Sequence, residues 1–291
     1  MAADESAVLH AHATGLTLRD AFFDDDVTNA DRIVATAEVT GVVKAEARGD
    51  ELADASVIAG AEAIAKGIEA FEVEVGGTFL NSGFVGVSAS VDHESVATAD
   101  GDDAYANIGY EDGEASWTYA SASGIDLRAI GSFTFDNQHD GEIDFDFEEG
   151  EDDQGIIYVM ADAHSDNYAH ADATDEASAL LFHEDRASAV GVNIQAYGSE
   201  EYFATVTNSG FIGAYAFAGA DEERGQEAYA ESSGGDALAV VEHEAYADAL
   251  GGFVAANEFS NSGLIGALAD ANASAYAHAD ADGGEATAYA Y

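Results

Sequence analysis

One phrase recurs along the 291-residue chain: an alternating alanine segment that ends in glycine, followed by a turn built on asparagine. The clearest copies are AIAKGI at 63–68 with NSGFV at 81–85, and ASAVGV at 187–192 with NSGFI at 208–212. Fainter copies contain Gly15, Gly124 and, with valine in place of glycine, Val241, so the copies are spaced by 52, 57, 67 and 50 residues. Spacing that drifts in this way is typical of stacked repeat proteins, whose loops tolerate insertions.

The alternation predicts β-strands. From 267 to 281 every odd position is alanine and the even positions are mostly polar or aromatic, so in a strand one face carries only methyl groups. The chain contains no proline, a residue that removes a hydrogen-bond donor from a sheet. A helix over 53–66 is the alternative, because alanine favours helices, but alanine and valine follow a two-residue period there. Because alanine side chains are small, we expect a thin, tightly packed body in which Phe71, Phe133 and Phe135 fill wider parts of the core.

The corners of such a body are predicted at the glycines and at the Asn-Ser-Gly turns. Both asparagine and glycine tolerate positive φ, and asparagine side chains stacked on successive coils form amide ladders. Phe84, Phe211 and Leu264, just after the corners, would stack on one another. We therefore predict an all-β, repeat-built, β-solenoid-like architecture, with a β-sandwich or antiparallel meander as the alternative.

The repeats favour one elongated domain over 1–291. Its five degenerate repeats are expected near 11–52, 53–110, 111–180, 181–235 and 236–291.

The charge balance restricts the partners of the chain. There are 58 Asp and Glu against 8 Lys and Arg, a formal net charge of −50. Nucleic acid is excluded as a partner, because phosphates require Lys and Arg, and anionic membranes are disfavoured. A hydrophobic content of 47% with sustained alternation argues against a disordered acidic chain. We predict a protein adapted to high salt, where carboxylate repulsion is screened over about 3 Å at 1 M; a calcium-rich environment is the alternative.

Other features bear on location. The chain lacks cysteine, so disulfides are excluded, and no apolar run approaches the roughly 18 residues that would predict membrane insertion. The first residues lack the basic and apolar regions of a signal peptide. This leaves open another export route, a processed or internal piece, or assembly inside a cell, as for virion proteins.

The phrases A-x-A-x-G-I and N-S-G-x-I resemble the repeat regions of large bacterial and archaeal surface proteins, including adhesins and filamentous-hemagglutinin-like proteins. The resemblance covers most of the chain. It implies an extracellular structural or adhesive role and assigns no chemistry to particular residues.

Two segments are candidates for metal binding. The segment from 136 to 144 resembles a calcium loop of the form D-x-[DN]-x-[DN]-G-x-I, with oxygen ligands around a glycine turn. The candidate calcium ligands are Asp136, Gln138, Asp140, Glu142 and Asp144. An acidic hairpin turn is the alternative. His10 and His12 lie two residues apart, so they share a strand face and either hold a transition metal or are exposed decoration.

The sequence predicts no enzyme. It contains neither G-x-S-x-G nor a glycine-rich phosphate loop followed by lysine, and no carboxylate pair is distinguished from the others. The predicted function is that of a structural subunit of an extracellular filament or surface fibre of a salt-adapted microbe. Its predicted partner is itself, as a homopolymer or homo-oligomer assembled by strand pairing between subunits. The alternative is a cell-surface or viral-fibre adhesin that binds a glycan or host receptor through a tyrosine-rich face. The predicted location is extracellular or on the cell surface, with a virion as the alternative.

Overall fold

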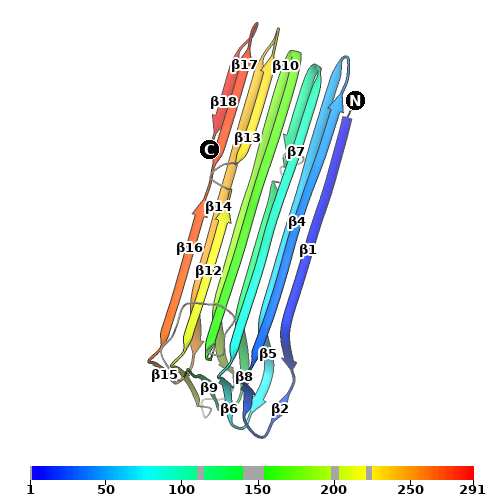
Figure 1. Ribbon diagram of the computed structural model, residues 1–291. Coiled ribbons are helices and arrows are strands. Elements are labelled where there is room, and N and C mark those ends of the chain that lie inside the picture. Colours follow the sequence, from blue (N-terminus) through cyan, green and yellow to red (C-terminus); the bar gives the residue numbers. More distant parts are fainter. Residues whose placement is uncertain (1, 110–114, 140–153, 198–202, 221–224) are drawn as a thin grey trace.

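The computed structural model describes residues 2–109, 115–139, 154–197, 203–220 and 225–291, and these residues form an all-β fold with no helix among them (Figure 1). The strands are β1 (Ala2–Arg19), β2 (Phe22–Phe23), β3 (Val27–Asn29), β4 (Arg32–Arg48), β5 (Leu52–Val75), β6 (Thr78–Asn81), β7 (Phe84–Ile108), β8 (Ser116–Ile130), β9 (Phe133–Asn137), β10 (Ile156–Tyr197), β11 (Ala204–Asn208), β12 (Phe211–Gly219), β13 (Gln226–Ser232), β14 (Ala237–Ala255), β15 (Glu258–Asn261), β16 (Leu264–Asn272), β17 (Ala275–Ala281) and β18 (Ala286–Ala290).

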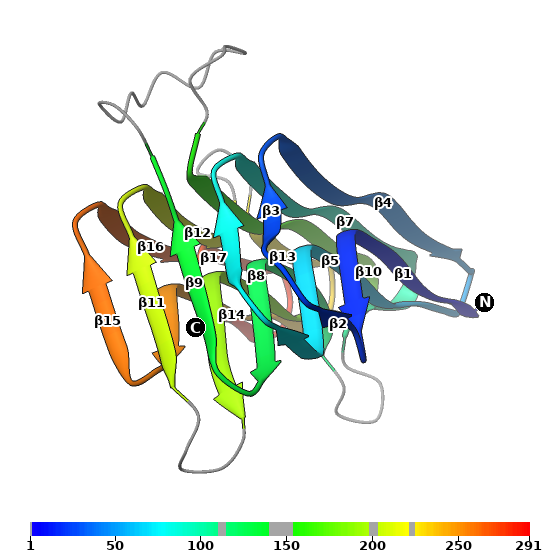
Figure 2. The same ribbon diagram turned by 90° about the horizontal axis from the view of Figure 1, so that it is seen from below.

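Every pairing between described strands is parallel, so the antiparallel meander is wrong. The chain ascends along the long axis in Figure 1, turns, descends, and then crosses one end in a short strand before it ascends again. The short strands β3, β6, β9, β11 and β15 form a five-stranded sheet that Figure 2 shows side by side. The long strands belong to a 13-stranded sheet, because strands such as β10 continue through the turn from ascent to descent.

The ascending and descending layers pack face to face through alanine. β4 and β5 contact each other without being paired, and so do β12 and β14. In the descending layer, Ala63, Ala120 and Ala187 occupy one column and are almost completely buried. The helix expected as the alternative over 53–66 is therefore wrong, because the two-residue period decides which side chains are buried. Phe133 and Phe135 fill the core beside the short sheet, as predicted, whereas Phe71 is 40% exposed.

The register corrects the fifth repeat. Ala11, Ala63, Ala120, Ala187 and Ala247 pair in succession, so the last step is from Gly191 to Gly251 and spans 60 residues. Val241 instead pairs with Leu181, ten residues before the Gly191 bend in the same pair of strands. The sequence suggests the wrong position because two alanine runs in one strand both place alanine at odd-numbered residues.

The repeated glycines lie inside strands and do not form the expected turns. In β8, the buried positions are even-numbered up to Gly124 and odd-numbered from Ile125, so the glycine marks a bend at which the inward face changes. The same reversal occurs at Gly67 and Gly191. A Cβ on Gly15 would lie 2.7 Å from the carbonyl oxygen of Gly67, so the paired strands approach too closely at the bend for any larger residue.

Candidate functional site

A ladder of asparagine side chains crosses the molecule at the corner after the short sheet. Each Nδ2 donates to the Oδ1 of the next asparagine at 2.7 Å, through Asn29, Asn81, Asn137, Asn208 and Asn261. The three inner members are almost completely buried. The amide ladder predicted from the Asn-Ser-Gly turns is thus confirmed. The stacking of the residues that follow them is confirmed in part, since Phe211 pairs with Leu264 but Ile156 lies between Phe84 and Phe211.

The ladder has a direction, and its two ends differ. Asn29 begins the series as a donor and Asn261 ends it as an acceptor. Within the part of the chain that the structure describes, the Oδ1 of Asn29 and the Nδ2 of Asn261 have no bond that continues the series. One end of the molecule therefore presents an amide acceptor, and the other presents an amide donor at the same column.

Unpaired strand edges accompany both ends of the ladder. At the first end, β1, β3 and β4 each pair on one side only. At the last end the same holds for β15, β16, β17 and β18. Apolar side chains at these ends are about half exposed: Val8, Val34, Val42, Phe259, Leu264 and Leu268.

The structure describes only part of the predicted calcium loop. Asp136 lies in β9, and its carboxylate accepts a hydrogen bond from the hydroxyl of Thr207 on the neighbouring strand. Gln138 is exposed directly after this strand. Asp140, Glu142 and Asp144 lie outside the described residues.

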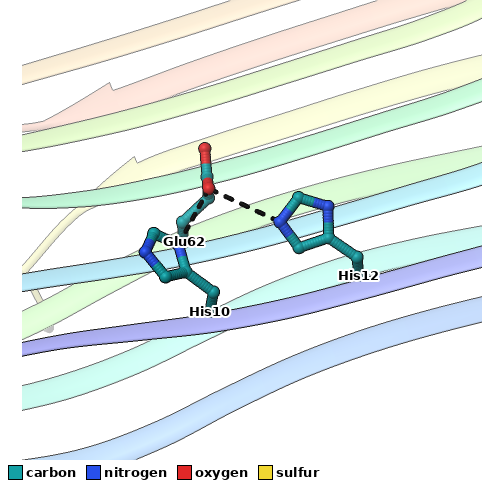
Figure 3. Close-up of side chains that lie close together, drawn as sticks. All are labelled: His10, His12 and Glu62. Carbon is teal, nitrogen blue, oxygen red and sulfur yellow. Dashed lines mark hydrogen bonds and ion pairs between the residues drawn. The ribbon is translucent and has the colours of Figure 1, made fainter.

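His10 and His12 do share a strand face, and the structure adds a third group. Figure 3 shows both imidazoles facing Glu62 of the paired strand β5. The Nδ1 of His10 lies 2.9 Å from Oε2 of Glu62, and the Nε2 of His12 lies 3.6 Å from the same oxygen. The sequence did not point to Glu62, because it is brought to His10 by a pairing across 52 residues.

Between the two layers lies a buried polar cluster centred on Asp185, which is completely buried. Its carboxylate accepts hydrogen bonds from the hydroxyls of Thr118 and Ser165 and from the Nε2 atoms of His183 and His243, the last at 2.7 Å. Burial acts to raise the pKa of Asp185, but the charge of His183 and the hydrogen bonds from both histidines outweigh it and hold the pKa well below its usual range. The carboxylate is therefore ionised inside the protein.

The cluster continues into the ascending layer. The hydroxyl of Ser165 accepts a bond from Gln226, whose Oε1 accepts from Asn167 at 2.6 Å. Beside Asn167, Ser95 bonds the Nε2 of His93 at 2.9 Å. These residues lie along the strands between two separate apolar clusters, one beside the short sheet and one at the opposite end of the molecule. The core is thus divided by a polar layer.

The two-residue alternation alone would have revealed this polar layer. His183 and Asp185 fall on the same odd-numbered face as the buried Ala179 and Ala187. Asp185 was nevertheless missed, because an acidic side chain rarely lies in a protein core unless it is paired.

No protein-family model matches the chain, and comparisons with curated proteins and with solved structures found no match. Within the described ranges there is no helix long and apolar enough to cross a membrane.

Proposed function

We propose that the chain is a β-solenoid subunit that stacks head to tail with further copies of itself into a filament. The observation that carries this proposal is the pair of complementary ends: the same columns end in unpaired parallel edges on both sides of the molecule. A contact between two different surfaces of identical subunits generates an open fibre when the rotation from copy to copy does not close a ring, and a stack that continues the parallel strand pairing advances along one axis.

The asparagine ladder supports a specific alignment of the copies. If the register of the coils continues from one copy to the next, the Nδ2 of Asn261 meets the Oδ1 of Asn29 in the following copy. The direction of the four observed bonds would then be retained across the boundary. A reversed copy would place two donors or two acceptors together.

The stacking uses all the end strands and not the C-terminal segment alone. The C-terminal strand β18 pairs with β14 of its own chain and is only one of several strands at this end of the molecule. Removing this segment would expose the edge of β14 in its place. The test must therefore address the alignment of the ends.

Cysteine cross-linking tests that alignment, because the natural chain contains no cysteine. Thr28 and Ser260 are exposed and occupy the same column of the short sheet at opposite ends. In a continued stack they lie about one or two strand spacings apart between copies, roughly 5 to 10 Å. The double variant Thr28→Cys, Ser260→Cys, treated with a short bis-maleimide in molar NaCl, should give covalent ladders of many subunits.

The single-cysteine variants are the controls, and they should give monomers and at most occasional dimers. Negative-stain microscopy of the untreated protein should show filaments one molecule wide. Dispersed particles together with only monomeric products from the double variant would refute head-to-tail stacking.

We further propose that the filament belongs to the surface of a salt-adapted microbe. The support is the charge of −50 on a fold that nevertheless buries alanine faces between its two layers. High salt screens this charge and permits many copies to assemble.

An aromatic surface favours adhesion as the second candidate function. The rings of Tyr168, Tyr229 and Tyr276 form a row of tilted contacts along the outer face of the ascending layer, with neighbouring centroids 5.5 Å apart, and His170 and His278 lie beside them. Tyrosine combines an apolar ring with a polar hydroxyl and is enriched at interfaces, which suits contact with a sugar. Tyr229→Ala with Tyr276→Ala should abolish binding to a glycan array but leave filaments intact if the face is adhesive; unchanged glycan binding would argue against this role.

A further inference from the structure

We propose that His10, His12 and Glu62 form a binding site for a divalent transition metal of the zinc class. The three ligand atoms lie within 4.8 Å of one another, and they come from two strands whose pairing fixes their spacing. The site does not depend on filament formation, because all three residues belong to one chain.

The donor set selects the metal. Two imidazole nitrogens and one carboxylate are ligands that Zn²⁺, Co²⁺, Ni²⁺ and Cu²⁺ accept, whereas Ca²⁺ and Mg²⁺ prefer oxygen. Two histidines and a glutamate leave a fourth position open for water or an added ligand. The many exposed acids of this protein attract any cation, but among the residues that the structure describes only His10, His12 and Glu62 bring two solvent-accessible imidazoles and a carboxylate within 4.8 Å of one another.

The geometry requires little rearrangement. Ligand atoms around a tetrahedral zinc ion lie about 3.3 Å apart, given bonds of about 2.0 to 2.1 Å. The separations of 2.9 and 3.6 Å from Glu62 to the two histidines bracket this value. Both imidazoles are at least half exposed, so they are free to rotate toward a common centre.

The nearest cation on the same strand does not compete for Glu62. The ammonium group of Lys66 lies 2.6 Å from the carboxylate of Glu69, which also binds Arg19 at 3.1 Å. Lys66 therefore leaves the carboxylate of Glu62 available to His10 and His12. This carboxylate holds the two histidines together before the metal arrives, which lowers the entropic cost of binding.

Cobalt titration tests the site, because Co²⁺ bound by nitrogen and oxygen in a tetrahedral site absorbs strongly in visible light, whereas hexa-aqua Co²⁺ is nearly colourless. The titration is made in molar NaCl with a large excess of Mg²⁺, which occupies the non-specific acidic positions. We expect one equivalent of Co²⁺ to develop the tetrahedral spectrum and one equivalent of Zn²⁺ to abolish it.

His10→Ala, His12→Ala and Glu62→Gln should each weaken Zn²⁺ binding by more than about tenfold, the loss typical of removing even an indirect partner of a metal. His278→Ala, at an exposed strand position of the opposite layer, is the matched control and should bind normally. Circular dichroism verifies that each variant is folded. A Co²⁺ spectrum that is octahedral, or a Zn²⁺ affinity unchanged in the His10→Ala, His12→Ala double variant, would overturn the proposal.

Discussion

The side-chain amide of Asn81 donates to Asn137 at 2.7 Å while its own oxygen accepts from Asn29, so a single buried residue links the ends of three neighbouring strands, β3, β6 and β9. Replacing Asn81 by alanine removes both bonds and leaves one donor and one acceptor without partners. We expect a loss of about 2 to 4 kcal/mol in the free energy of unfolding. Urea denaturation in molar NaCl measures this loss.

Asn29→Ala is the matched control for the ladder, since it removes only one bond at the edge of the stack. Its cost should be about 1 kcal/mol. Equal costs for Asn29→Ala and Asn81→Ala would show that the ladder does not act through successive bonds.

The second prediction concerns Asp185 in the polar layer. Asp185→Ala would leave the side chains of Thr118, Ser165, His183 and His243 without their shared acceptor. Breaking a buried charged cluster on one side costs about 3 to 5 kcal/mol, so we expect the melting temperature to fall sharply. Asp172→Ala, an exposed acid on the same strand, should change stability by about 0.5 kcal/mol or less. Similar effects of the two substitutions would indicate that the polar layer contributes no specific stability.

The third prediction is a pH dependence due to His93. Burial, together with the nearby charge of His183, lowers the pKa of His93 to about 4, against opposing effects of Asp185 and Asp92. Histidine in an unfolded chain has a pKa of about 6.5, so between about pH 4 and 6.5 the unfolded state binds more protons than the folded state. Stability should therefore fall as the pH drops through this window, by up to roughly 3 kcal/mol.

His93→Gln isolates that effect, because glutamine does not titrate. In urea titrations at high salt, the variant should lose less stability than the natural chain between pH 6.5 and 4. His278→Gln is the control and should retain the full dependence. If His93→Gln and the natural chain have parallel pH profiles, His93 is not the titrating group.

The fourth prediction concerns the alanine layer. Ala120 is completely buried, whereas Ser121 next to it faces outward. Ala120→Leu should force the layers apart at a cost of about 1 to 3 kcal/mol or more, while Ser121→Leu should cost little. Thermal unfolding measures the stability of both variants. Equal melting temperatures for Ala120→Leu and Ser121→Leu would contradict the close packing of the two layers at Ala120.

Period-two alternation predicted the all-β fold, and the Asn-Ser-Gly turns predicted the ladder, because both signals are local and repeat in every coil. The position of the fifth repeat was not predicted, since Ala239 and Ala249 lie in one strand with the same parity. Glu62 was also missed, because only the pairing of β1 with β5 brings it to His10. Local patterns specify which face of a strand a residue occupies, but the length of each loop decides which residue of the neighbouring strand it pairs with.

The last prediction concerns salt. The 58 acids repel one another across a thin body that offers only 8 basic residues to neutralise them. Among the described basic residues, Arg19 and Lys66 share one acid, Glu69, so local ion pairs offset little of the charge. Lowering NaCl from molar to millimolar should therefore lower the melting temperature strongly, and Mg²⁺ or Ca²⁺ should restore it at far lower concentration. A melting temperature that does not change with NaCl would refute adaptation to salt, because dissolved ions should stabilise this protein by screening the repulsion between its exposed carboxylates.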